Sequence, residues 1–392
     1  MSKKVVYFFI SVLLCLLTIT NISGNFNVVK ASEQNYFNDF SSQSYMLIDN
    51  NSGEILFSNN ENQKMPVASI CKLMTALITI ENIEAGDLAL TDKLVASNYA
   101  CEAEGSQAFL DAGSEYAVSD LLKSVIVASA NDSSIVLAEA IGGSEANFVK
   151  LMNKRAKELS MTNTLYENST GLPSANQYST AKDCALILKE ISKHNLYKEN
   201  CQIWMDKLIH PSGRETELVN TNRLIRYYDS CVTGKTGFTD EAGYCLVSTS
   251  EKNGMNLTAV TLKCKDASSR FKESIELFEY GFNNFENKKV VSADQSLSFD
   301  LPVNKGKQEK VNLIAEKDLF TIIKKGDDDQ VELKYELIES INAPVNAGEI
   351  VGKIIALKNG VVCGETNIIC LNDIEKQNFA DIFVKIINRW EI

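Results

Sequence analysis

The sequence predicts an α+β protein: a domain that combines an antiparallel sheet with helical clusters, then a small all-β domain, then a C-terminal amphipathic helix. Three observations carry this prediction. Residues 69–210 hold several stretches with helical periodicity, and residues 231–264 hold short runs rich in valine, threonine and aromatics. Residues 290–374 keep short alternating runs but lose the helical period. With 392 residues, the chain is long enough for two domains.

The first 31 residues are typical of a secretory signal peptide. Lys3 and Lys4 precede the apolar run "VVYFFISVLLCLLTIT", and small residues at Val29 and Ala31 suit cleavage after Ala31. The alternative is a retained membrane anchor, but the apolar core is shorter than the ~20 residues that span a bilayer comfortably. We therefore expect residues 1–31 to be removed and the mature protein to be secreted.

The region that follows predicts a hairpin and then helices. Residues 42–60 alternate and turn between Asp49 and Gly53, which is typical of a β-hairpin. Ser119 and Ser144 each stand before a helical pattern as candidate N-caps. The stretches with helical periodicity are 69–80, 119–141, 144–160 and 183–210.

Three strands and a helix complete the first domain. The runs "CVTGKTGF", "YCLVSTS" and "MNLTAVTLKC" are separated by "TDEAG" and "EKNG", so we expect adjacent antiparallel strands. A helix is expected over residues 266–285. The first domain then covers residues 38–285, and the small β-rich domain covers residues 290–374.

The last residues, 377–392, predict one amphipathic helix. The residues on its apolar face are Phe379, Ile382, Phe383, Ile386 and Trp390. Such a helix can pack on its own domain, or it can lie in a membrane interface with its aromatic rings at headgroup level. We favour the membrane-anchoring interpretation.

Composition argues against several classes of protein. A net charge of −12 argues against a nucleic-acid partner, because such proteins need a cationic surface to meet phosphates. Only two histidines, His194 and His210, and no CxxC pair argue against a zinc site. We expect no metal and no cofactor. Nine cysteines follow the predicted signal peptide, so at least one is unpaired, and we expect buried thiols.

A serine and a lysine three residues apart, Ser69 and Lys72 in "VASICKLMT", are the first candidate reactive groups. On a helix this spacing puts the amine beside the hydroxyl. Apolar neighbours would lower the lysine pKa, so that a neutral amine could take the serine proton. The alternative is a serine N-cap and a lysine that reaches solvent. The motif is weak alone, and the chain has two more, Ser179–Lys182 and Ser269–Lys272.

Two further motifs follow. In "VIVASAND", Ser129 could relay a proton and the Asn131 amide could orient a substrate; the alternative is a turn between helices that Asn131 caps. In "TGKTGF", the glycines allow an extended ligand to approach the backbone of an expected strand. Lys235 and Thr236 would bind a carboxylate, and the strand edge would pair with a peptide. The alternative is an ordinary strand lysine at a hairpin.

In the order SxxK, SxN and KTG, these motifs resemble the set of penicillin-binding proteins and β-lactamases. Longer stretches, such as "MPVASICKLMTALI" and "GKTGFTDEAGYCLV", resemble the serine-type D-alanyl-D-alanine carboxypeptidases, the low-molecular-mass penicillin-binding proteins. The resemblance implies a β-lactamase/transpeptidase-like catalytic domain at 38–285, that family's small C-terminal domain at 290–374 and its anchor at 377–392. It implies removal of the terminal D-alanine from peptidoglycan stem pentapeptides outside the cytoplasmic membrane, and acylation by β-lactams such as penicillins.

The resemblance also implies catalytic roles. Ser69 attacks the carbonyl between the two terminal D-alanines, and Lys72 acts as its base. Ser129 relays a proton to the leaving D-alanine, and Asn131 orients the peptide. Water then hydrolyses the acyl-enzyme.

The third motif implies binding roles. Lys235 and Thr236 hold the terminal carboxylate, with Gly237 next to them on the strand. The backbone N–H groups of Ser69 and Phe238 resemble an oxyanion hole. Such preorganised donors contribute roughly 3 kcal/mol each where measured.

Three residues depart from the family pattern. Ala130 stands where glycine is usual in the middle motif, Gln177 where histidine is frequent, and Cys71 where threonine is common. None of them removes a reacting group, so they bear on rate and substrate preference. Lys72 and Lys235 would favour a Cys71 thiolate if the thiol faced them, which predicts a site sensitive to alkylation.

Two alternatives remain for the function. A β-lactamase of the same superfamily would need a glutamate to activate the deacylating water. Glu167 is the candidate, although its setting "YENSTGLP" matches the carboxypeptidase pattern. The other alternative is a non-catalytic cell-wall-binding protein that keeps the fold. All the reacting groups are present, which argues against it.

Overall fold

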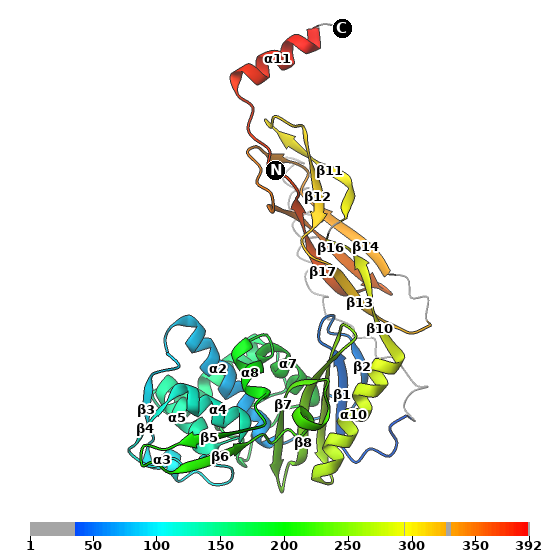
Figure 1. The fold of residues 1–392 in the computed structure, drawn as a ribbon. Helices are drawn as coiled ribbons and strands as arrows, with labels where there is room; N and C mark the ends of the chain where they lie inside the picture. Colours follow the sequence, from blue (N-terminus) through cyan, green and yellow to red (C-terminus); the bar gives the residue numbers. More distant parts are fainter. Residues whose placement is uncertain (1–35, 294, 327–330, 391–392) are drawn as a thin grey trace, which may run out of the picture.

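The computed structural model describes residues 36–293, 295–326 and 331–390. The predicted signal peptide, residues 1–31, lies outside these ranges. The described chain forms two units (Figure 1). The first is a sheet surrounded by helices, and the second is an elongated β-rich unit with a single helix at its far end. This is the α+β architecture that the sequence predicts.

The first unit is built on a five-stranded antiparallel sheet with the strand order β2-β1-β9-β8-β7. The expected hairpin and the three expected adjacent strands are confirmed. Because β7 ends the order, the strand with the KTG motif leaves one edge unpaired within this sheet. The strand bounds are β1 (Ser44–Asp49), β2 (Ile55–Asn59), β7 (Cys231–Thr239), β8 (Gly243–Lys252) and β9 (Met255–Cys264).

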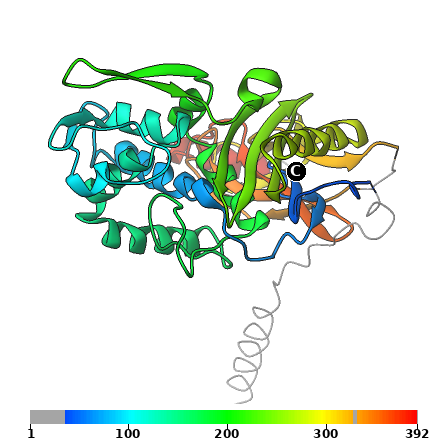
Figure 2. The same ribbon diagram turned by 90° about the horizontal axis from the view of Figure 1, so that it is seen from below.

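Helices cover both faces of this sheet. One face carries α10 (Ala267–Asn284), which confirms the helix expected over 266–285 and buries an apolar stripe against β1 and β9. Asp266 caps α10 by accepting hydrogen bonds from N–H groups of its first turn. The other face carries α7 (Ala181–Ile191) and α2 (Lys72–Ala85). Figure 2 shows α10 on one side of the strands and the helical cluster on the other.

The helical cluster differs from the prediction at two points. The single helix expected over 119–141 is two helices, because the chain breaks between them at Ser129, which has a left-handed φ of 62°. Ser119 is not an N-cap; α4 begins one residue earlier, directly after a strand. Ser144 is an N-cap and accepts from the N–H of Asn147. The cluster contains η1 (Ala68–Cys71), α3 (Asn98–Cys101), α4 (Val118–Val127), α5 (Asn131–Gly142), α6 (Glu145–Glu158), α8 (Asn195–Cys201) and α9 (Leu224–Tyr227).

Two small hairpins extend the first unit. One pairs β3 (Lys93–Val95) with β4 (Glu115–Ala117), and the other pairs β5 (Met205–Ile209) with β6 (Glu215–Val219). The prediction that residues 183–210 are mainly helical is therefore wrong at its end. The run at β5 pairs with β6, and Leu208 and Leu218 of the two strands are buried in the same core cluster.

The second unit is built from strands and the turns that join them. Its described residues up to 374 form no helix, as the sequence predicts. Its six-stranded sheet has the order β14-β16-β17-β12-β11-β15 and its own apolar core. The pair β10–β13 joins it to the first unit, where Ile322 packs beside Phe278 and Phe285. The bounds are β10 (Phe285–Val291), β11 (Ser296–Asn304), β12 (Lys310–Ala315), β13 (Leu319–Lys324), β14 (Val331–Leu337), β15 (Ile341–Asn342), β16 (Ile350–Lys358) and β17 (Val361–Cys370).

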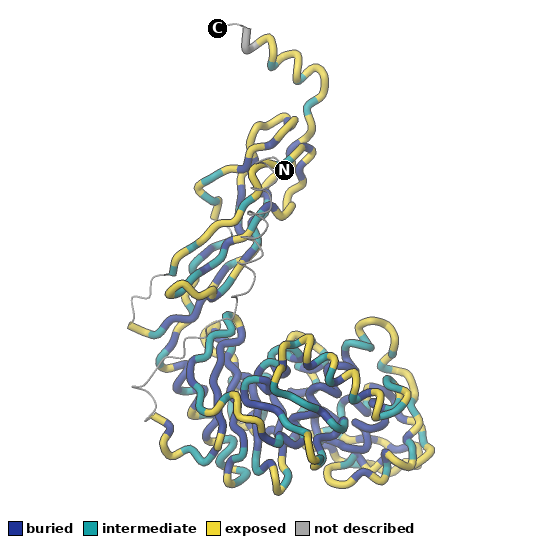
Figure 3. Tube along the Cα trace, turned by 180° about the vertical axis from the view of Figure 1, so that it is seen from behind, coloured by how far each residue is buried: buried dark blue, intermediate teal, exposed yellow. Residues whose placement is uncertain are grey.

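The helix α11 (Phe379–Trp390) follows the β-rich unit, as predicted. Its apolar face is exposed: Phe379 is 84% exposed, and Phe383 and Ile386 are more than half exposed. Figure 3 shows this exposure along the helix. The side chain of Trp390 lies outside the described part of the chain. In the described ranges, no helix is both long and apolar enough to cross a membrane.

The thiols are buried, as the sequence predicts. Within the described residues all nine cysteines are free, and only Cys101 is half-exposed. The same residues contain no group of three or more His, Cys, Asp or Glu side chains that could hold a metal ion.

Candidate active site

Ser69 lies in the 3₁₀ turn η1, which leads directly into α2. The side-chain nitrogen Nζ of Lys72 lies 2.9 Å from Ser69 Oγ. Lys72 is only 1% exposed, and neither η1 nor α2 has a side-chain cap. The alternative of a serine cap and a solvent-facing lysine is therefore wrong.

The surroundings of Lys72 suit a base. Burial lowers its pKa to about 7, and the charges of Cys71 and Asp132 oppose this shift only in part. Lys72 Nζ also donates to the carbonyl oxygen of Thr170 at 2.6 Å, which fixes the amine beside the serine. Near neutral pH, a large fraction of this lysine is therefore uncharged and able to accept a proton.

The SxN residues lie at the break between α4 and α5. Ser129 Oγ accepts a hydrogen bond from Lys235 Nζ at 2.8 Å. Asn131 is held by its Nδ2, which donates to the carbonyl of Glu104 at 2.5 Å, and by its backbone N–H, which donates to Ser106 at 2.7 Å. Its Oδ1 is buried and has no hydrogen-bond partner among the described residues. A buried acceptor without a partner is costly, so this oxygen is suited to an incoming N–H group.

The KTG residues lie on the edge strand β7. Lys235 is 2% exposed, and its pKa is well below the usual value because of burial, with the nearby charges of Lys72 and Arg270 adding to the effect. An anion next to Lys235 would relieve both costs. Thr236 Oγ1 donates to Thr221 Oγ1 at 2.7 Å. Phe238 is 47% exposed and stacks on Tyr244, so it flanks the strand edge.

Two glycines let the backbone close around the Ser69 turn. A Cβ on Gly237 would lie 2.3 Å from the carbonyl oxygen of Val67, and a Cβ on Gly171 would lie 2.0 Å from that of Ala68. Real Cβ atoms do not approach so closely, so only glycine fits at both positions. The absence of a side chain at 237 brings β7 next to the backbone N–H of Ser69.

The loop 167–177, which supplies the Thr170 carbonyl, is not predicted by the motifs. Gln177 Oε1 accepts from the N–H groups of Glu167 and Asn168, so this departure from the family pattern has a structural role. The Glu167 carboxylate accepts from Ser174 and Asn176 within the same loop. Among the described contacts it has none with Ser69 or Lys72, which leaves it poorly suited to activate a water there.

The hypothesis of a reactive Cys71 thiolate is wrong. Burial raises the pKa of this thiol to about 12, and the charge of Lys72 opposes the shift only in part. Cys71 Sγ donates to the carbonyl of Asn168 at 3.3 Å, so it points into the 167–177 loop.

Together the three motifs meet in one place. They combine a hydroxyl with a neutral amine, a second hydroxyl with a second lysine, an amide acceptor and an open strand edge. This set fits acyl transfer to a serine from an extended peptide-like substrate.

Comparisons with known proteins agree with this geometry. The family model described as D-alanyl-D-alanine carboxypeptidase matches residues 28–266, and that of the penicillin-binding protein 5 C-terminal domain matches residues 285–376. The D-alanyl-D-alanine carboxypeptidase DacF of Bacillus subtilis is 33% identical over 349 residues, which cover 89% of this chain and 90% of that protein.

Solved structures show the same relationship. Penicillin binding protein 5 from Haemophilus influenzae has a TM-score of 0.71 and 32% identity, covering 86% of this chain and 98% of that chain. A peptidoglycan synthesis regulatory factor from Streptococcus pneumoniae has a TM-score of 0.76 and 25% identity, covering 86% of this chain and 100% of that chain. The chain therefore belongs to the D-alanyl-D-alanine carboxypeptidase family of low-molecular-mass penicillin-binding proteins.

Proposed function

We propose that this chain is a serine-type D-alanyl-D-alanine carboxypeptidase that removes the terminal D-alanine from peptidoglycan stem pentapeptides and is acylated by penicillins. The observation that carries the proposal is the contact of 2.9 Å between Ser69 Oγ and the buried Lys72 amine, in a member of this family. Removal of the terminal residue leaves no D-Ala-D-Ala donor for transpeptidation, so cross-linking falls.

In the proposed acylation step, Ser69 Oγ attacks the carbonyl between the two D-alanines while Lys72 takes its proton. The developing oxyanion meets the N–H groups of Ser69 and Phe238. Support for the second donor comes from the close approach of β7 to the Ser69 turn. The unpartnered Asn131 Oδ1 is suited to hold the peptide by accepting one of its N–H groups.

The terminal carboxylate lies on Lys235 and Thr236 in this proposal. Lys235 reaches Ser129 Oγ at 2.8 Å, so Ser129 can pass a proton to the nitrogen of the departing D-alanine. The C–N bond breaks and D-alanine leaves as an amine. Water then attacks the ester on Ser69, which returns the proton to the serine and frees the shortened peptide.

The proposal extends to the organisation of the chain. Residues 1–31 would export the protein, residues 38–285 would hold the catalytic site, and residues 290–374 would form a separate β-rich domain. Residues 377–392 would bind the outer face of the cytoplasmic membrane. The exposed apolar face of α11 supports this last assignment.

The experiment that tests the function is D-alanine release from diacyl-L-Lys-D-Ala-D-Ala by a protein of residues 32–392. We expect release that Ser69→Ala abolishes. Ser269→Ala, which changes the serine of another SxxK motif, is the matched control and should keep full release. No release from the unaltered protein overturns the proposal; turnover of a penicillin would then indicate a β-lactamase, and failure to bind one would indicate a non-catalytic protein.

A further inference from the structure

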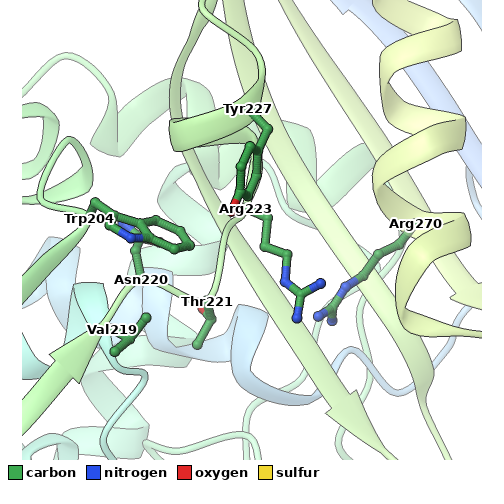
Figure 4. A pocket seen from close by; sticks show the side chains of 7 residues that line it. All are labelled: Trp204, Val219, Asn220, Thr221, Arg223, Tyr227 and Arg270. Atoms are coloured by element: carbon green, nitrogen blue, oxygen red, sulfur yellow. The ribbon is translucent and has the colours of Figure 1, made fainter.

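A pocket of about 590 Å³ opens beside the edge strand β7, a volume within the roughly 300–1,000 Å³ of small-ligand pockets. Thr221, one of its lining residues, is the hydrogen-bond partner of Thr236 in the KTG motif. Through this contact, the wall of the pocket adjoins the proposed carboxylate site. The lining residues are Trp204, Val219, Asn220, Thr221, Arg223, Tyr227 and Arg270 (Figure 4).

The lining of this pocket is rich in hydrogen-bond donors and carries positive charge. The side chains of Arg223, from the start of α9, and Arg270, from α10, extend toward one another (Figure 4). Arg270 Nη1 donates to the carbonyl of Gly237 at 3.1 Å, which fixes this guanidinium against β7. None of the salt bridges between described residues includes either arginine.

Two of the side chains that line the pocket each have a buried donor without a partner. Among the described residues, the buried nitrogens Nε of Arg270 and Nε1 of Trp204 have no hydrogen-bond acceptor. Burial lowers the pKa of Arg270, and the charge of Arg223 adds to this effect. A buried donor without a partner and two adjacent cations are both unfavourable, and one bound anion would relieve both.

We infer that this pocket binds a second anionic group on the leaving side of the scissile bond. The inference rests on the proposed function, in which the terminal carboxylate lies on Lys235 and Thr236. Atoms beyond the terminal Cα then face the pocket, which is far larger than the methyl group of alanine. The rings of Trp204 and Tyr227 give apolar walls for connecting methylene groups.

Two leaving groups share this chemistry: a terminal D-residue with an acidic side chain, and the neighbouring stem peptide of a cross-link, which carries free carboxylates. Hydrolysis of either substrate follows the same steps as the release of D-alanine. The amide bond after the penultimate D-alanine breaks, water supplies the hydroxyl group to the carbonyl carbon, and the leaving amine receives the proton.

Binding tests the pocket without turnover. The sequence has two tryptophans, so Trp390→Phe leaves Trp204 as the single tryptophan, and Ser69→Ala prevents acylation. In this protein we expect diacyl-L-Lys-D-Ala-D-Glu to change the fluorescence of Trp204 with a Kd about tenfold below that of the D-Ala-D-Ala peptide, because of one added charge-assisted contact. The D-Ala-D-Lys peptide should bind more weakly than either. Equal affinities for the three peptides would overturn the inference.

Measurements of turnover test whether Arg223 binds the second anionic group. Arg223→Gln should lower the ratio of kcat/KM for D-Glu release to that for D-Ala release about tenfold, and Arg223→Lys should keep most of it. Lys272→Gln is the control, since Lys272 is 79% exposed on α10, the helix of Arg270, and does not line the pocket. If Arg223→Gln leaves this ratio unchanged, the inference is contradicted. The guanidinium would then interact only with the terminal carboxylate, which both peptides have.

A third substrate separates the two sources of the anion. Cleavage of a cross-linked muropeptide dimer that depends on Arg223 identifies the neighbouring stem, while dependence confined to the D-Glu peptide identifies a terminal acidic residue. If cleavage of neither substrate depends on Arg223, the inference is overturned. A different result would separate the two proposals. If the unaltered protein releases no D-alanine but the binding assay still shows tighter binding of the D-Glu peptide, the proposed function is contradicted and the assignment of the pocket stands.

Discussion

Burial acts in opposite senses on the acidities of two adjacent side chains, Lys72 and Cys71. Removal from water favours the neutral form of every titratable group. The lysine therefore loses its proton more easily, and its pKa falls to about 7, while the thiol holds its proton and its pKa rises to about 12. The same apolar surroundings thus produce a base at one position and an inert thiol at the next.

The first prediction concerns the pH dependence of acylation. The base must be uncharged, and the uncharged fraction of Lys72 grows as pH rises through its pKa of about 7. The second-order rate of acylation by a fluorescent penicillin should therefore increase about tenfold per pH unit below pH 7 and level off above it. Lys72→Arg should abolish acylation, because a guanidinium stays charged. A rate that does not change between pH 5 and 9 would exclude Lys72 as the base.

The second prediction concerns thiol alkylation. Iodoacetamide at pH 8 should leave Cys71 unmodified and activity intact, because its thiol is buried and protonated. Cys101, which is half-exposed, should react first. Mass spectrometry of peptides identifies the modified sites, and the unfolded protein in guanidinium serves as the control in which Cys71 reacts. Rapid modification of Cys71 in the folded protein would contradict its burial.

The structure brings together the residues that the sequence singles out by their side-chain chemistry, while their roles stay a prediction. Ser69, Lys72 and Lys235 are recognisable because hydroxyl and amine groups at fixed spacing suit nucleophile, base and anion binding. Thr170 was not predictable, since it contributes a backbone carbonyl that every residue has. Arg270 was not predictable either, because only the packing of α10 brings it beside β7.

At the scale of elements, the approach of β7 to the 3₁₀ turn η1 depends on Gly237. The third prediction is that Gly237→Ala lowers acylation at least 100-fold, because the new methyl group pushes the strand away from the carbonyl of Val67. We also expect a stability loss of about 1–3 kcal/mol from overpacking. Penicillin acylation and thermal unfolding measure the two effects.

The control for this substitution is Gly360→Ala, in the turn between β16 and β17. That glycine has a φ of 76° and no atom near its would-be Cβ, so the change tests backbone strain without steric contact at the site. It should lower Tm and leave acylation unchanged. Full acylation by the Gly237→Ala protein would show that β7 tolerates a side chain there, contrary to the geometry.

Elements were predictable where periodicity and end signals agree. The helix α10 and the strands β7 to β9 follow from their patterns and from the turns between them. The break at Ser129 was predicted only as an alternative, because apolar periodicity continues on both sides of it. The strand β5 was missed because its short run has a helical composition, and pairing with β6 decides its conformation.

At the scale of the whole molecule, two apolar cores meet at β10 and β13, and α11 projects beyond the second core (Figure 1). The fourth prediction is that the protein of residues 32–392 sediments with phospholipid vesicles and that deletion of residues 379–392 abolishes this binding. The reason is the exposed apolar face of α11, whose insertion gains free energy with buried area. Acylation by penicillin should be unchanged by the deletion.

Single substitutions distinguish insertion from nonspecific adhesion. Phe383→Asp places a charge on the apolar face and should reduce vesicle binding severalfold. Lys385→Gln, on the polar face, is the matched control. It should reduce vesicle binding only slightly, and added salt should reduce the binding of the unaltered protein to a similar extent. Vesicle binding that survives Phe383→Asp would indicate that α11 does not insert through this face.

The elongated β-rich unit also has a consequence for where the enzyme can act. Its longest strands have nine to ten residues, so each spans roughly 30 Å. If α11 rests on the membrane, this unit works as a spacer, and the reactive serine samples a thin layer of wall at a set height. Diffusion then becomes a search in two dimensions, with an effective concentration fixed by tether geometry. Shortening the spacer would change which layer of wall is trimmed, with no change in catalysis on a soluble peptide.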